Sequence, residues 1–154
     1  MWRSMSPAMI LVLTLAVNSA AAAPRIGELE VREGNGGLPC FSISQAEEQR
    51  GGAPNFDAIT VSDGKAVLWT MAMPKQRTFP VTFRMCIPYA GRLPVLPQMP
   101  AAALQAGKAY DVYVATRKPG AAPQGYRGRF CMVKQAQGLM KVRSLGAKGG
   151  CQVL

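Results

Sequence analysis

Histidine is absent from this chain of 154 residues, and that absence removes two kinds of catalytic machinery. Neither a Ser-His-Asp triad nor a Cys-His pair can be assembled, because the imidazole is the general base in both. The most common protein ligand for transition metals is missing as well. The four cysteines contain no C-x-x-C pair, so the sequence also lacks a zinc-binding pattern. We expect no cofactor and no metal.

The other candidates for catalysis or metal binding have little support. Glu47 and Glu48 are adjacent, and a glycosidase pair needs one desolvated carboxyl and a defined gap between the two. Composition favours two solvated side chains instead. Met71 and Met73 offer soft thioether ligands for Cu(I), but packing in a strand explains Met71 better. A Ser-Lys dyad at Ser144 has no local support, so we expect a protein that is not an enzyme.

Acidic residues are almost missing from the second part of the chain. From Gly64 onward fourteen Lys and Arg residues stand against Asp111 alone, whereas residues 23–63 hold seven acids and three arginines. Such a basic surface favours anionic partners and nonspecific association. Plain solubility is the alternative explanation.

The apolar run from Ala8 to Val17 is too short to span a bilayer. It follows Arg3 and precedes the small residues 19–23, which is the pattern of a secretory signal peptide. Cleavage after Ala22 would give a signal peptide of residues 1–22 and a single domain of residues 23–154. No cysteine lies near the cut, so we expect no lipid anchor. The protein is then periplasmic or secreted, and nucleic acid is excluded as a partner.

All the cysteines lie in the exported part, at Cys40, Cys86, Cys131 and Cys151. An even count in an oxidising compartment predicts two disulfides, with three connectivities open.

The stretch from Leu104 to Thr116 carries the clearest fold signal. Its spacing Leu-x-x-Gly-x-x-Tyr ends at Tyr110 and is followed by alternating apolar residues. This is the signature of a tyrosine corner, in which the phenol bonds to upstream backbone. Tyr110, Val112 and Val114 should face the core.

Alternation predicts further strands, and Ser44 to Glu47 would cap a helical turn. The expected strands are residues 28–32, 38–44, 58–62, 65–71, 78–87, 126–134 and 139–145. Asp63-Gly64 predicts a two-residue hairpin turn, and Pro80 argues for an edge or a bulge. Without a sustained helical period, the pattern favours an all-β fold, an antiparallel immunoglobulin- or fibronectin-like β-sandwich of 7–8 strands.

This arrangement bears on the disulfides. The second strand and the strand before the corner would be neighbours in one sheet, so Cys40–Cys86 is the preferred pair. Cys131–Cys151 would then fasten the C-terminal tail to the last hairpin.

Tyrosine and arginine dominate binding hot spots, and the chain has several of both. The candidate binding face is Tyr89, Arg92, Tyr113, Tyr126, Arg127 and Arg129. The alternative is that the tyrosines are half-buried strand residues and the arginines ordinary surface charges.

Three short segments resemble a known family. They are Pro39–Ile43, Arg84–Pro88 and Gly107–Val114, and they are similar to landmarks of small periplasmic lipoproteins of the type VI secretion immunity class. The resemblance spans about residues 29–116. It implies a small β-sandwich that protects its producer by binding a toxin in the periplasm. The chain departs from the pattern by lacking the lipidation cysteine and by carrying Cys131 and Cys151.

We therefore expect an exported, non-enzymatic binding protein with a protein partner. The first alternative is an envelope protein that binds anionic glycan or lipopolysaccharide through its basic C-terminal half. The second is a small hydrolase.

Overall fold

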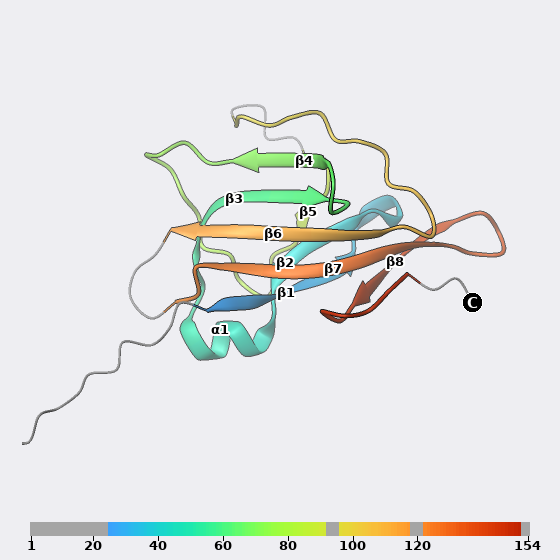
Figure 1. The fold of residues 1–154 in the computed structure, drawn as a ribbon. Helices are drawn as coiled ribbons and strands as arrows, with labels where there is room; N and C mark the ends of the chain where they lie inside the picture. Colours follow the sequence, from blue (N-terminus) through green and yellow to red (C-terminus); the bar gives the residue numbers. More distant parts are fainter. Residues whose placement is uncertain (1–24, 92–95, 118–121, 152–154) are drawn as a thin grey trace, which may run out of the picture.

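The computed structural model describes residues 25–91, 96–117 and 122–151. The expected signal peptide and its cleavage site lie outside the described residues. The elements are β1 Ile26–Glu33, η1 Asn35–Gly37, β2 Pro39–Ile43, α1 Gln45–Gly51, β3 Asn55–Ser62, β4 Val67–Ala72, β5 Ile87–Pro88, β6 Ala109–Arg117, β7 Gly125–Lys134 and β8 Met140–Leu145 (Figure 1). The all-β class is confirmed.

The eight strands form one curled, mixed sheet in the order β4-β3-β6-β7-β1-β2-β5, with β8 also paired to β7 (Figure 1). β1 changes partner along its length. Residues 26–28 pair parallel with β7, and residues 29–33 pair antiparallel with β2. The purely antiparallel arrangement expected from the sequence is therefore wrong, because strands far apart in the chain are free of the hairpin constraint and can pair in parallel. The immunoglobulin-like sandwich stays a prediction.

The tyrosine corner is confirmed. Tyr110, Val112 and Val114 are buried, and the phenolic oxygen of Tyr110 accepts a hydrogen bond of 2.7 Å from the backbone N–H of Gln105. Gly107 makes the bend with a φ of 77°, in the region that glycine adopts without strain. The start of β6 is thereby fixed against the residues that precede it.

The first predicted hairpin forms, but with a longer loop. β3 ends at Ser62 and β4 begins at Val67, so four residues connect them where two were expected. The carboxylate of Asp63 accepts backbone hydrogen bonds from Lys65 at 3.0 Å and Ala66 at 2.9 Å, and this local bonding stabilises the wider turn. The second predicted hairpin, β7–β8 around residues 135–138, is confirmed.

The strand expected at residues 78–87 is wrong over most of its length. Only Ile87–Pro88 is a strand, with an isolated bridge between Asn55 and Pro80 further back. Pro80 itself takes part in that bridge, which the hydrogen bonds from Phe56 N to Phe79 O and from Val81 N to Pro54 O flank. The extended run ends beyond it in a turn, closed by the hydrogen bond of 3.1 Å from Met85 N to Thr82 O.

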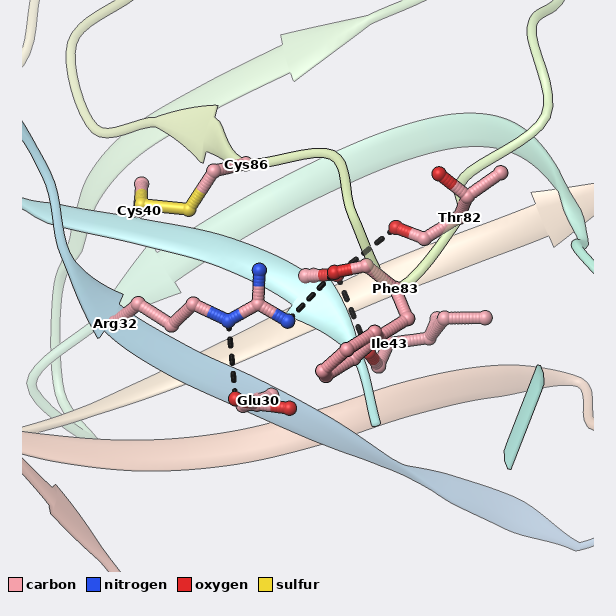
Figure 2. Close-up of a disulfide and its surroundings, with 8 residues drawn as sticks. Glu30, Arg32, Cys40, Ile43, Thr82, Phe83 and Cys86 are labelled. Carbon is pink, nitrogen blue, oxygen red and sulfur yellow. Dashed lines mark hydrogen bonds and ion pairs between the residues drawn. A yellow bond between two sulfur atoms is a disulfide. The ribbon is translucent and has the colours of Figure 1, made fainter. Parts of the chain in front are cut away.

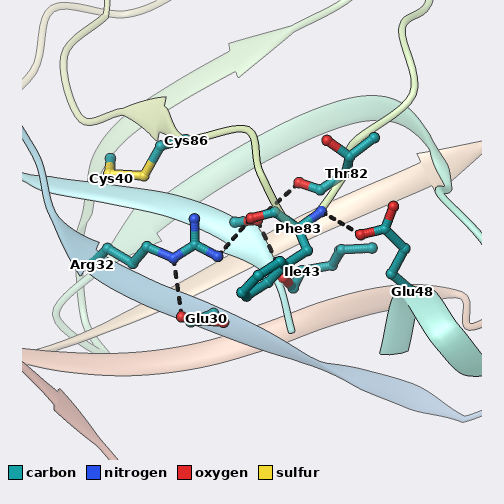
Figure 3. A network of polar contacts seen from close by, with 9 residues as sticks. Glu30, Arg32, Cys40, Ile43, Glu48, Thr82, Phe83 and Cys86 are labelled. Atoms are coloured by element: carbon teal, nitrogen blue, oxygen red, sulfur yellow. Dashed lines mark hydrogen bonds and ion pairs between the residues drawn. A yellow bond between two sulfur atoms is a disulfide. The ribbon is translucent and has the colours of Figure 1, made fainter. Parts of the chain in front are cut away.

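Side chains hold this segment where strand pairing is missing (Figure 3). The backbone N–H of Phe83 donates to Glu48 Oε2 at 2.8 Å, and its carbonyl accepts from the guanidinium of Arg32. The hydroxyl of Ser42 lies 3.0 Å from the same carbonyl, and the guanidinium carbon of Arg32 sits 4.4 Å from the centre of the Phe83 ring. These contacts satisfy backbone groups that a ladder would otherwise pair.

Both expected disulfides are confirmed. Cys40–Cys86 joins β2 to the residue before β5 (Figure 2), and Cys131–Cys151 joins β7 to the C-terminal tail. Two disulfides indicate an oxidising compartment. In the part of the chain that the structure describes, no helix is long and apolar enough to cross a membrane.

The proline-rich connection covers the open edge of β4. Met99 N donates to Thr70 O at 3.1 Å, and Ala102 N donates to Leu68 O at 2.9 Å. An uncovered edge is a template for pairing with another chain. A partner is thus unable to add a strand beside β4 without displacing this segment.

Candidate functional site

The structure divides the candidate binding face. Tyr89 and Tyr126 are 4% and 0% exposed, so including them in a binding face was wrong. Both are core residues, buried more deeply than the half-buried strand positions of the alternative, and Tyr89 follows β5. The hydroxyl of Tyr89 donates to Ala102 O at 2.7 Å. Burial raises the pKa of Tyr89 to about 12, with a smaller contribution from Tyr110. Arg92 lies outside the described residues.

Tyr113, Arg127 and Arg129 do lie together, on the face of the sheet that points away from the core. β3, β6 and β7 are consecutive in the sheet (Figure 1), and their register places Thr60, Tyr113 and Arg127 in one cross-strand row. We call the outward side chains of these three strands the outer face. Cross-strand neighbours in such a row interact directly.

Tyr113 and Arg127 form the centre of the outer face. The guanidinium carbon of Arg127 is 6.0 Å from the centre of the Tyr113 ring, at the limit of a cation–π contact. The Tyr113 ring lies over Gly125, where any side chain would collide with its hydroxyl. Arg127 is exposed and makes no ion pair among the residues that the structure describes. Its charge is consequently available to a partner.

A hollow of about 340 Å³ lies beside this pair. It is lined by Thr60, Ser62, Asp111, Val112, Tyr113 and Arg127. Hydroxyl groups, a carboxylate and a guanidinium therefore surround one aromatic ring.

A larger hollow, of about 780 Å³, opens where the pairing of β1 with β7 stops and the C-terminal end of β8 pairs with β7 instead. We call it the fork groove. Its walls are the start of β1, the adjoining part of α1, the middle of β7 and the loop that follows β8. In Figure 1, α1 lies below β1, and the loop after β8 lies on the same side of the sheet.

Glu47 forms the α1 side of the fork groove, and its expected solvation is wrong. The residue is 6% exposed because its carboxylate receives Arg25 at 2.9 Å and Arg50 at 3.6 Å. Ser44 caps the helix as predicted, accepting from Glu47 N at 3.2 Å. Since Glu48 binds a different segment through its carboxylate, the two carboxyls do not face one gap.

The opposite wall of the fork groove is built around Arg129. Its guanidinium pairs with Asp111 at 2.9 Å and donates to Gly149 O at 3.0 Å. The Cys131–Cys151 disulfide returns the tail to β7 beside these contacts. The loop after β8 is thus fastened at two points.

Four arginines and three acids line the fork groove, namely Arg25, Arg50, Arg127, Arg129, Glu28, Glu47 and Asp111. Sequence reasoning missed Arg25 and Arg50. No local pattern marks them, because α1 and the start of β1 approach β7 only through the fold.

Met71 lies in β4, and Met73 follows that strand directly. Met71 is 2% exposed and packs in the core, as its position in a strand suggested. No group of three or more His, Cys, Asp or Glu side chains suited to a metal occurs among the described residues.

No protein-family model, no curated protein and no solved structure matches this chain.

Proposed function

We propose that this protein is an exported, non-catalytic binding protein that docks an acidic protein partner on its outer face. The observation that carries the proposal is the Tyr113–Arg127 pair, in which an exposed guanidinium, with no ion pair among the described residues, lies beside an aromatic ring on the outward side of the sheet. Tyrosine and arginine are the residues most enriched in binding hot spots. The pairing of β6 with β7 fixes the backbone beneath both side chains, so docking does not have to order this part of the main chain.

Charge supports an acidic partner. The chain carries a formal net charge of +10, and a field of that sign accelerates encounter with negatively charged surfaces. The acids on the outer face are already engaged, since Asp111 pairs with Arg129 at 2.9 Å. Arg127 is left to meet the carboxylates of the partner.

The arrangement of strands supports an immunoglobulin-like sandwich as the scaffold. β1 exchanges one partner strand for another midway, at residues 28–29, and so bridges two groups of strands. The tyrosine corner at Tyr110 is a feature of the same architecture. In sandwiches of this kind, outward side chains alternate along each strand with those of the core.

A non-catalytic role is supported by what the candidate catalytic groups do. Glu47 is held by two arginines and Glu48 by the backbone of Phe83. Both carboxylates are therefore occupied by structural contacts. An immunity-type protein that neutralises a toxin in the periplasm fits this profile, and the resemblance of residues 29–116 to such proteins adds support.

Affinity capture from periplasmic extract at low salt tests the proposal. Proteins retained by the wild-type chain should be lost with Tyr113→Ala and with Arg127→Gln, and kept with Lys134→Gln. Lys134 is exposed at the end of β7, away from the outer-face centre, and its substitution removes the same charge. Equal retention by all four chains would contradict docking at this face.

The second candidate function is binding of an anionic envelope polymer. It is favoured by the fourteen Lys and Arg residues that follow Gly64, which are spread over several elements. Sedimentation with purified cell wall, abolished by salt and unaffected by Arg127→Gln, would support this function over protein docking.

A further inference from the structure

We propose that the fork groove binds an acidic peptide segment of the partner, in which a carboxylate side chain is flanked by apolar ones. The inference rests on the proposed function, because the partner that docks on the outer face would supply the segment. The groove has an excess of guanidinium groups over acids, a partly apolar lining, a direct connection to the outer face and a rigid wall.

Two of the three acids in the groove are already neutralised. Glu47 receives Arg25 at 2.9 Å, and Asp111 receives Arg129 at 2.9 Å. Arg50 contributes only a long contact of 3.6 Å to Glu47 and is 62% exposed. Together with Arg127, it leaves two guanidinium groups against one exposed acid, Glu28. Guanidinium groups bind carboxylates with charge-assisted hydrogen bonds.

The lining favours a peptide over an inorganic anion. Ile26 at 44% exposed is one of the large apolar residues at the surface, and Leu145 and Ala147 line the same groove. A volume of about 780 Å³ is within the range of sites for sizeable organic ligands. An inorganic ion would leave most of that apolar surface exposed to water.

The groove continues directly into the outer face. Arg127 and Asp111 line both the fork groove and the smaller hollow beside Tyr113. A partner docked over Tyr113 therefore needs no separate anchor to place a segment in the groove. The two contacts would act together, with the second made at a high effective concentration.

The wall formed by the C-terminal tail is held in place before binding. Arg129 donates to Gly149 O at 3.0 Å, and Cys131–Cys151 fixes the end of the same loop. A wall fastened at two points loses little conformational freedom when a segment binds, which favours affinity.

Titration with short peptides tests the inference without the natural partner. The probe is an N-acetylated hexapeptide of alternating Glu and Leu, with a Gln/Leu hexapeptide and inorganic phosphate as comparisons. Arg50→Gln and Arg127→Gln should each weaken probe binding about tenfold, since each removes a charge-assisted hydrogen bond. Lys134→Gln is the matched control and should leave the affinity unchanged. Amide shifts in an NMR titration should map to residues 128 and 144–147.

Three results would overturn the inference. They are equal weakening by Lys134→Gln, equal affinity for the Gln/Leu peptide, and full competition by phosphate at the same concentration as the probe. Amide shifts confined to other parts of the chain would also contradict it, and that measurement uses the wild-type fold.

Failure of the groove and failure of the proposed function give different results. If Tyr113→Ala abolishes partner capture while Arg50→Gln leaves it intact, the outer face stands and the groove inference fails. If the Glu/Leu probe binds as expected but no protein is captured through Tyr113, the groove stands and the proposed function fails.

Discussion

The backbone N–H of Gln105 donates a hydrogen bond of 2.7 Å to the phenolic oxygen of Tyr110, five residues further along the chain. Tyr126, also buried, places its hydroxyl where no hydrogen-bond partner is found among the described residues. A Tyr→Phe substitution keeps the ring at either position. Comparing the two substitutions therefore isolates the contribution of the Tyr110 hydrogen bond to the free energy of unfolding.

Tyr110→Phe should destabilise the protein by about 1–2 kcal/mol, because it leaves the N–H of Gln105 without its partner. Tyr126→Phe should be neutral or stabilising, because it removes a buried hydroxyl that gains nothing in the fold. Denaturant unfolding with the disulfides intact measures both. Equal destabilisation by the two substitutions would contradict a stabilising contribution of the hydrogen bond between Gln105 and Tyr110.

Ser42→Ala should destabilise the protein by about 1–2 kcal/mol. Its hydroxyl is fully buried and lies 3.0 Å from the carbonyls of both Thr82 and Phe83, so it helps to hold the segment that replaces the expected strand. Ser144→Ala is the control, because Ser144 is exposed on β8 and should change stability by less than about 0.5 kcal/mol. Equal effects at the two serines would show that this segment is held by other contacts.

Removing the tail disulfide with Cys131→Ala and Cys151→Ala should cost about 3 kcal/mol through the unfolded state. The substitution should also raise hydrogen exchange at residues 146–150 and weaken binding of the Glu/Leu probe, since the wall of the fork groove loses one of its two fastenings. The Cys40→Ala, Cys86→Ala chain is the comparison. It should be destabilised too, yet its folded fraction should bind the probe normally, because that disulfide lies away from the groove.

The free energy of unfolding should fall as the pH rises from about 10 to 12. The pKa of Tyr89 is raised from 10.0 to about 12 by burial and, to a lesser extent, by Tyr110. Burial and then Glu47 raise the pKa of Tyr126 as well, against a smaller opposing effect of Arg25. The unfolded chain therefore releases these protons at lower pH than the fold does, and the stability held below pH 10 is lost above it.

Phenolate absorbance measures this directly. Among the four tyrosines of the chain, Tyr89 and Tyr126 should titrate late, and Tyr89→Phe should remove one late transition. A single common transition near pH 10 in the folded protein would contradict the burial of these two hydroxyls.

Much of the fold follows from local sequence pattern, and the site follows from it only in part. The corner at Tyr110, the helix cap at Ser44 and both disulfides were predictable, because each depends on short spacing or on residue type. The strand at residues 78–87 was not, since the chain turns at residues 82–85 and side chains of β1, β2 and α1 bind this segment in place of a ladder. The parallel pairing of β1 with β7 was not predictable either, because the sequence of one strand does not indicate which strand it pairs with or in which direction.

The same limit applies to the functional residues. Tyr113, Arg127 and Arg129 were predicted as part of a binding face from residue type alone, and the register of β6 with β7 places them near one another. Tyr89 belongs to the core. It was predicted to lie on a binding face because tyrosine is enriched in binding hot spots. Arg50 reaches the groove only because α1 packs beside the start of β1, and nothing in its neighbourhood along the chain marks it.

Site-specific photo-crosslinking in the producing cell tests the central claim most directly. Benzoylphenylalanine would replace Tyr113 at the centre of the outer face in one chain, and exposed Arg84 in the segment packed on β1 and β2 in the other. The account predicts a discrete adduct with an acidic protein from position 113 and none of that mass from position 84. No protein adduct from position 113, or the same adducts from both positions, would contradict it.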